Sequence, residues 1–365
     1  MTRNKYIKRL FILFLVACSV STRMFAATTA EGGEINPKEI IFEHVKDAYW
    51  WHIATVNGRH ISLYLPVIVY SSNSGFHLFS SAHIDHGHKY KDFFISTSER
   101  DEGKIVELDN NGVEKRPVDL SITKTALAIF LNSVLMITIF LSLARMYKKR
   151  PKHYVPRGIA GMMEMLIMDI EENVIRGCIG KDYARYSPYL LTAFFFILLS
   201  NLMGLIPFFP GGANVTGNIG VTLVLALCTM AAINLFGNKA YWKDIFWPDV
   251  PVWLKAPFPL MPLIELFGVL SKPFALTIRL FANITAGHAV ILALICLIFI
   301  TARMGAAANA GMTAFSILLS VFMSFLEILV AYIQAYVFTM LSAVFIGLSR
   351  QEHSHASRRL KRRKQ

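Results

Sequence analysis

Two long apolar runs near the C-terminus of the chain contain ionisable side chains. Arg279 lies in the run 260–302 and Glu327 lies in the run 311–349. A charge at membrane depth costs at least about 2.5–3.5 kcal/mol, so such a residue usually has a function or a partner. Arginine stays charged in a protein, whereas glutamate and histidine can exchange protons near neutral pH. A fixed cation near proton-exchanging groups suits proton transfer across a membrane.

The residues around Arg279 fall on one face of a helix. At about 100° per residue this stripe contains Ala275, Arg279, Asn283, Ala286 and Ala293, with Ala282 and Gly287 at its edges. Glu265 precedes the arginine by fourteen residues and lies on the same stripe, whereas His288 points to the opposite side, about 13 Å further along the axis. Small residues beside the charge would let another helix approach closely.

The second run carries a polar line on an otherwise apolar helix. The line consists of Thr313, Ser316, Ser320, Ser324, Glu327 and Gln334. It can border water or another helix. The spacing also allows a structural alternative, in which Arg279 and Glu327 pair to fasten the two helices and His288 is a satisfied core residue. A secondary transporter, a channel and a structural membrane anchor remain rival classes, although internal repeats typical of transporters are not evident.

The composition indicates a membrane protein. Hydrophobic residues make up 54% of the 365 residues, and the mean hydropathy is +0.46. The net charge of +13 is concentrated in the short flanks of the apolar runs and in the C-terminal tail, which is typical of membrane topology and argues against a nucleic-acid partner. The four cysteines show neither paired spacing nor a metal-ligand pattern.

The apolar segments predict an all-α polytopic membrane protein with about five crossing helices. The crossings are 126–144, 188–209, 219–237, 260–302 and 311–349. The last two are each about twice the length of an upright crossing, so each is a long inclined helix or a double crossing. Because neither contains a good turn, two long inclined helices are favoured. The basic residues after the first crossing and at the C-terminus predict that both lie in the cytoplasm.

Four regions follow from this pattern. Residues 1–26 resemble a signal peptide that is cleaved off. Two alternatives remain: a lipoprotein signal that ends at residue 17, with Cys18 lipidated, or an N-terminal segment that is not cleaved and stays in the mature protein. Residues 27–119 predict a small extracytoplasmic β-containing region, and residues 120–349 a membrane domain with an amphipathic surface helix at 157–177. The family resemblance described below implies that this membrane domain is proton-translocating. Residues 350–365 form a basic cytoplasmic tail.

A cluster of possible metal ligands occurs in the extracytoplasmic region. The stretch "HIDHGHKY" contains His83, Asp85, His86 and His88. These residue types could bind a metal ion, but a solvated loop is the preferred interpretation, and no metal site is predicted.

The membrane domain resembles the membrane subunit a of bacterial F-type ATP synthases, part of the F0 sector. The resemblance covers about residues 120–350 and rests on "NLMGLIP" at 201–207, "LIELFGVLSKPFALTIRLFANITAGH" at 263–288 and "EILVAYIQAYVFTML" at 327–341. It implies a stator subunit that provides two proton half-channels beside a ring of c subunits. The implied subunit is not catalytic by itself and uses no cofactor.

The resemblance also assigns roles to individual residues. Arg279 would be the essential arginine that separates the half-channels and couples proton flow to rotation. His288, Glu327, Gln334, Asn283 and Glu265 would belong to the proton path, and Ala275, Ala282, Ala286 and Gly287 would be the small residues facing the rotor. The order of His288 and Glu327 is reversed relative to many bacterial members. Gly204 and Phe345 stand where some members have an acid and a tyrosine.

The implied partners are the c ring, the peripheral-stalk subunit b, the soluble F1 sector through the complex, and membrane lipid. The implied location is the bacterial cell inner membrane, with the N-terminal region extracytoplasmic and the C-terminus cytoplasmic. The sequence leaves open whether the coupled ion is a proton or sodium, because the selecting carboxylate would belong to another chain.

Overall fold

The fold is known from a computed structural model, which describes residues 47–350 apart from 57–58, 73–74, 85–87, 97, 99–100, 109–113, 150–154, 207–209, 248–259 and 302–305. Two compact units share these residues. The first unit contains the segments up to Asn132, Met203–Val215 and Gly287–Phe325. The second unit contains Ser133–Leu202, Thr216–Ala286 and the chain from Leu326. Several helices therefore contribute one part to each unit.

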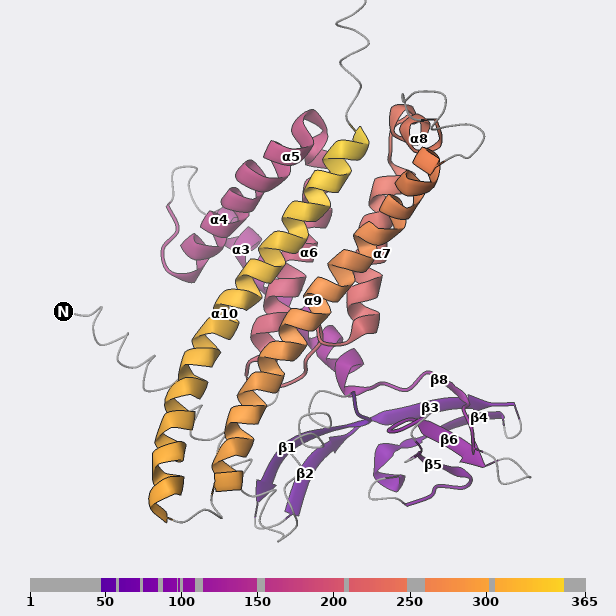
Figure 1. Cartoon of the computed structure of the whole chain (residues 1–365), viewed down its shortest axis with the longest axis vertical. Helices are drawn as coiled ribbons and strands as arrows, with labels where there is room; N and C mark the ends of the chain where they lie inside the picture. Colours follow the sequence, from indigo (N-terminus) through magenta and orange to yellow (C-terminus); the bar gives the residue numbers. More distant parts are fainter. Residues whose placement is uncertain are drawn as a thin grey trace, which may run out of the picture. The chain divides into compact units, whose positions relative to one another are not determined.

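The first unit contains the N-terminal β-region, which is built of three small antiparallel sheets (Figure 1). The first pairs β1 (Trp50–Val56) with β2 (Arg59–Tyr64). The second has β3 (Pro66–Ser71) between β4 (Gly75–Ser80) and β8 (Val118–Asp119). The third has β6 (Ile105–Leu108) between β5 (Phe93–Ile95) and β7 (Glu114–Lys115), and a 3₁₀ turn, η1, covers Ser81–His83. The predicted β-containing region is confirmed.

The β-region has its own apolar core. Alternate residues of β3, including Val67 and Val69, are fully buried against Phe79, Phe93 and Ile105. The rings of Phe79 and Phe93 are stacked with their centroids 6.0 Å apart. This packing joins the β3–β4–β8 sheet to the β5–β6–β7 sheet, so the described residues of the β-region cover one face of the β3–β4–β8 sheet.

The remaining described chain is helical. Its elements are α3 (Lys124–Lys149), α4 (Ile159–Asp169), the π-helix η3 (Ile170–Arg176), α5 (Gly177–Ile179), the 3₁₀ turn η4 (Gly180–Asp182), α6 (Tyr183–Gly204), α7 (Ile219–Leu235), α8 (Lys239–Phe246), α9 (Leu260–Thr301) and α10 (Ala306–Arg350). Four stretches of the described chain are long and apolar enough to cross a membrane, and the pair α7–α8, bent by 100°, would be a fifth. The predicted multi-pass helical class is confirmed.

The two C-terminal runs are continuous helices. Helix α9 has 42 residues and α10 has 45. At a rise of about 1.5 Å per residue these lengths correspond to about 63 and 68 Å, far more than a bilayer core of about 30 Å. Since an uninterrupted helix cannot turn back, the double-crossing alternative is wrong for both runs. Pro273 lies inside α9, and the Thr277 hydroxyl donates to its carbonyl oxygen at 2.9 Å.

The second unit encloses the main helical core. Its fully buried side chains come from η3, α6, α9 and α10, and they include Ile170, Ile175, Leu190, Phe194, Phe195, Ile197, Leu280, Phe338 and Ile346. Figure 1 shows α6 and α7 beside the upper parts of α9 and α10. The predicted surface helix packs into this core through Met163, Ile170 and Ile175, while Met162, Met165 and Met168 remain exposed. Its π-helical turn was not predicted.

Some sequence predictions concern residues outside the described ranges. They include the signal peptide at 1–26, the alternative lipidation of Cys18, the basic tail beyond Arg350, and Asp85 and His86 of the histidine cluster. Among the described residues, no group of three His, Cys, Asp or Glu side chains could hold a metal ion.

Candidate functional site

Helix α9 presents opposite faces to the core and to its surroundings in the second unit. Leu276, Leu280 and Ile284 recur every four residues and are buried, so this face holds α9 against its neighbours. The other face carries Ala275, Arg279, Ala282, Asn283 and Ala286, which are all exposed. These five residues, called the exposed stripe below, coincide with the stripe that the sequence periodicity predicts. Within this chain the arginine therefore points away from the core.

Arg279 has no hydrogen-bond or ion-pair partner among the described residues of its own chain. In particular, no ion pair with Glu327 forms there, whereas Arg350 of the same unit pairs with Asp182 at 2.5 Å. A guanidinium group carries five hydrogen-bond donors and cannot be deprotonated in proteins. At membrane depth it needs an anionic or aqueous partner, and the exposed stripe is open to a partner from another molecule.

Asn283 and Gln334 connect α9 to α10. The Asn283 side-chain nitrogen donates to the side-chain amide oxygen Oε1 of Gln334 at 2.9 Å. Gln334 is only 3% exposed, whereas Asn283 is exposed one turn after Arg279. The hydrogen bond satisfies a buried amide and holds the Asn283 side chain at the edge of the exposed stripe.

A second polar contact ties α6 to α10 near the same level. The Asn201 side chain donates to the Ala331 carbonyl oxygen at 3.4 Å and accepts from the Thr216 hydroxyl at 2.5 Å. Ala331 lies between Glu327 and Gln334 on α10, so this contact supports the helix segment that carries both. Neither Asn201 nor Thr216 is among the site residues predicted from the sequence. An asparagine inside the apolar run 188–209 was the signal that could have identified the contact.

Two of the three ionisable residues of the predicted proton path, Glu327 and His288, are withdrawn from the surface. Glu327 is only 5% exposed in the second unit. His288 is half-buried in the first unit, where a Cβ atom on Gly204 would lie 3.6 Å from its Nε2 atom. The absence of a side chain at Gly204 therefore leaves space next to the imidazole. Gly287 is also half-buried in this unit.

The polar line of α10 has two kinds of contact. In the first unit, the Ser316 hydroxyl donates to the Leu294 carbonyl oxygen of α9, which links the two helices. The Ser324 hydroxyl donates to the Ser320 carbonyl oxygen at 2.9 Å, within α10 itself. A serine hydroxyl that donates to a nearby backbone carbonyl oxygen has its hydrogen bond satisfied within the protein, so it can lie at a helix interface in a membrane. Part of the polar line therefore serves helix packing.

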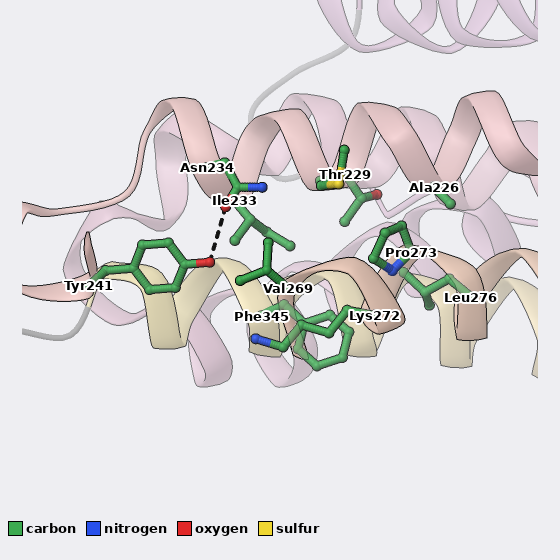
Figure 2. Close-up of a pocket in the computed structure, with 11 residues that line it drawn as sticks. Ala226, Thr229, Ile233, Asn234, Tyr241, Val269, Lys272, Pro273, Leu276 and Phe345 are labelled. Atoms are coloured by element: carbon green, nitrogen blue, oxygen red, sulfur yellow. Dashed lines mark hydrogen bonds between the residues drawn. The ribbon is translucent and has the colours of Figure 1, made fainter. Parts of the chain in front are cut away.

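A small cavity lies between α7, α8, α9 and α10 in the second unit (Figure 2). Its volume of about 10 Å³ has room for about one water molecule. Its polar groups include Lys272, whose ammonium group lies 5.3 Å from the centre of the Phe345 ring, and Tyr241, whose hydroxyl donates to Asn234 at 3.1 Å. Glu265 does not line the cavity and is exposed.

The second unit thus combines a permanent cation on an exposed helix face with a buried carboxyl and a buried amide on the neighbouring helix. This arrangement can attract an anion to the exposed stripe and exchange protons behind it. It offers no nucleophile–base pair and no metal cluster among the described residues. The chemistry it supports is ion pairing and proton transfer.

Comparisons with known proteins show which family the chain is similar to. Residues 126–347 match the family model described as "ATP synthase A chain", and residues 40–124 match a "Domain of unknown function (DUF8433)". The chain is similar to ATP synthase subunit a of Chlorobium phaeobacteroides, with 42% identity over 244 residues that cover 65% of this chain and 68% of the relative. It is similar to ATP synthase subunit a 2 of Prosthecochloris aestuarii, with 41% identity covering 65% and 71% of the two chains. For ATP synthase subunit a of Myxococcus xanthus the identity is 43%, covering 64% and 74%.

Proposed function

Because the chain belongs to the ATP synthase subunit a family, we propose that it provides two proton half-channels beside a c ring, with Arg279 as the barrier between them. Membership makes the chain a multi-pass membrane subunit of the ATP synthase complex, with a role in ion transport and without a catalytic centre of its own. The finer assignment of the arginine is a proposal, and the exposed stripe on α9 is the observation that carries it.

The physics of a rotating carboxyl explains why a fixed cation is needed. A carboxyl group can face lipid when it is protonated, because the ionised form is too costly there. A proton must therefore reach it through one aqueous path and leave through another. An arginine between the two paths pairs with the deprotonated carboxylate and prevents a protonated group from passing straight across. Each proton that crosses 100 mV delivers about 2.3 kcal/mol, which rotation can transmit to the soluble sector.

The geometry of α9 supports this role over a structural ion pair. A fastening pair would place Arg279 against Glu327, yet the described residues contain no such pair and the arginine is exposed. The alanines of the exposed stripe flank the cation with small side chains, which suits the close approach of a c subunit helix. The partner carboxylate therefore belongs to another chain in this proposal.

The other predicted site residues have three kinds of role in our proposal: proton exchange, positioning of the polar edge, and close approach to the rotor. His288 and Glu327 are the proton-exchanging groups of the inlet on the outer side, and Glu265 lies on the outlet towards the cytoplasm. Gln334 and Asn283 keep the polar edge of the exposed stripe in position through their hydrogen bond. Gly287 belongs with the small residues that face the rotor.

The proposed setting is the bacterial inner membrane. The N-terminal β-region would be extracytoplasmic and the C-terminus cytoplasmic, as the positive residues after the first crossing and at the end of the chain favour. The proposed partners are the c ring, peripheral-stalk subunit b and, through the complex, the soluble F1 sector. Neither a cofactor nor a nucleic acid enters this proposal.

Replacement of Arg279 tests the barrier role. In vesicles containing the assembled complex, Arg279→Ala should abolish ATP-driven acidification and ATP synthesis under an imposed gradient, while the complex still assembles. Arg279→Lys should not restore coupling, because an ammonium group lacks the planar fork and can lose its proton at a site of low dielectric. Ile278→Ala, which truncates an exposed neighbour on the same helix, is the matched control and should keep both activities. Near-normal coupling in Arg279→Ala would refute the assignment.

An exchange of the inlet residues tests their proposed coupling. His288→Glu and Glu327→His, each made alone, should reduce proton flow. The exchanged variant, with His288→Glu and Glu327→His together, should recover part of it, since many relatives in the family use that order. Losses in the exchanged variant that equal the product of the single losses would show that the two residues act independently.

A further inference from the structure

The β3–β4–β8 sheet has an exposed face that is almost entirely apolar. Its side chains are Tyr70, Phe76 and Leu78, with exposures of 53%, 64% and 63%, and Val118, Leu120 and Ile122, with exposures of 59%, 65% and 38%. We call these six residues the apolar sheet face. Large contiguous apolar patches on a protein surface mark sites that contact a partner or a membrane.

The strand register brings these side chains together. Tyr70 is paired with Phe76 on one side and with Val118 on the other, so three large apolar side chains lie in a row across the sheet. Leu78 is opposite Ile68, and the backbone N–H of Leu120 donates to the Ile68 carbonyl oxygen at 2.9 Å. The six residues are therefore one surface, since side chains two apart on a strand share a face.

The opposite face of the same sheet is already covered. Val67, Val69 and Phe79 alternate with the exposed residues and are buried against the β5–β6–β7 sheet, and Ser71 donates a hydrogen bond to Glu107 of β6. In Figure 1, β5 and β6 lie below β3 and β4, whereas the start of α3 lies above them. The apolar sheet face is therefore the face of this sheet that the β5–β6–β7 sheet does not cover.

The connection between the sheet and α3 is fixed by hydrogen bonds. After β8, the N–H of Ile122 donates to the Pro66 carbonyl oxygen at 3.3 Å, which continues the pairing along β3. The N–H of Lys124 donates to the Ala48 carbonyl oxygen at 2.8 Å, and the N–H of Thr125 donates to the Asp47 carboxylate at 3.0 Å. These hydrogen bonds link the start of α3 to β3 and to the segment that precedes β1.

We propose that the apolar sheet face lies on the lipid surface of the membrane at the N-terminal end of α3. The row Val118, Leu120 and Ile122 leads directly into α3, whose apolar side chains, such as Phe130, are exposed for contact with lipid. The sheet surface thus continues the membrane-contacting surface of the helix. Tyrosine and phenylalanine at this level suit the interface between headgroups and hydrocarbon, where an amphipathic surface binds in the plane of the membrane.

Spin labelling in the assembled complex tests the proposal. The complex is reconstituted into vesicles of phosphatidylethanolamine and phosphatidylglycerol, with Cys178, Cys228, Cys296 and Cys18 replaced by serine. Single labels are attached through Phe76→Cys and, in a second variant, Leu78→Cys. Lys115→Cys, on an exposed position of β7 in the other sheet, is the control. Collisions of the label are compared for oxygen, which concentrates in lipid, and for a water-soluble nickel complex.

We expect the ratio of oxygen to nickel accessibility to be several-fold higher for labels at positions 76 and 78 than at position 115. Equal ratios at all three positions would overturn the proposal, because the face would then be in water. Magnetic broadening between two labels would overturn it in favour of a second copy of the chain. Low accessibility to both reagents would overturn it in favour of cover by another protein segment.

Discussion

The hydrogen bond between Asn283 and Gln334 gives the sharpest quantitative prediction for the site. Asn283→Ala removes the donor and leaves the side-chain oxygen Oε1 of Gln334, a residue that is only 3% exposed, without its 2.9 Å partner. A buried polar group left unsatisfied costs about 1–3 kcal/mol, and the better helix propensity of alanine offsets about 0.5 kcal/mol. We expect Asn283→Ala to lower the free energy of unfolding by about 0.5–2.5 kcal/mol.

The partner variant should behave differently. Gln334→Leu removes the buried amide altogether and leaves Asn283 on an exposed face, where it can find other partners, so its cost should be smaller. The double variant should be no less stable than Asn283→Ala alone, because no buried polar group is then left unpaired. The coupling energy of the cycle should lie between about 0.6 and 1.7 kcal/mol, the average and the upper range for hydrogen bonds between membrane helices.

The assay is denaturant unfolding of the purified full chain in one detergent, followed for the four members of the cycle under identical conditions. ATP-driven pumping of the same variants in vesicles separates a loss of stability from a loss of transport. A coupling energy near zero would refute the reasoning, since it would mean that the two amides do not interact in the folded protein.

Two further predictions concern packing and pH dependence. A Cβ atom on Gly347 would overlap the carbonyl oxygen of Cys178, so Gly347→Ala should lower the free energy of unfolding by about 1–3 kcal/mol in thermal melts. Gly268→Ala is the control, because a Cβ atom there would have no described atom within 4 Å, and it should leave the stability unchanged. Equal effects of the two substitutions would contradict the close approach at Gly347. Burial and the hydrogen bond to Asp119 raise the pKa of the Tyr49 phenol, so its contribution to stability is complete below its ordinary value of about 10 and is lost as the pH rises above it. Tyr49→Phe should cost about 1 kcal/mol at pH 8 and should flatten the alkaline loss of stability in pH-dependent melting curves; unchanged curves would contradict this.

The sequence predicts the helical parts of the structure because hydrophobic periodicity and length carry that information locally. The exposed stripe around Arg279 follows from 3.6-residue periodicity, and the continuity of α9 and α10 follows from the lack of turn residues inside two runs of 42 and 45 residues. The ends of the helices were predicted less accurately, because the apolar run 311–349 gives no signal that α10 starts at Ala306. The π-helix η3 likewise has no distinct sequence signature.

Contacts between distant residues could not be predicted in the same way. Asn283 and Gln334 were both expected in the proton path, but their hydrogen bond joins positions 51 residues apart and depends on how α9 packs against α10. The Asn201–Thr216 contact is similar, because the loop that brings Thr216 back to α6 has no periodicity. The apolar sheet face was missed because its residues come from three strands and from the segment after β8, and the short strand β8 lies 38 residues after β4.

The most direct test of the proposed role of Arg279 is a structure of the intact complex that shows what the exposed stripe faces. The proposal predicts that a c subunit helix lies against Ala275, Ala282 and Ala286. It also predicts that the Arg279 guanidinium group lies within about 4 Å, or one bridging water, of the c subunit carboxyl group. A c ring that contacts a different face of α9, or an exposed stripe covered by lipid alone, would contradict it.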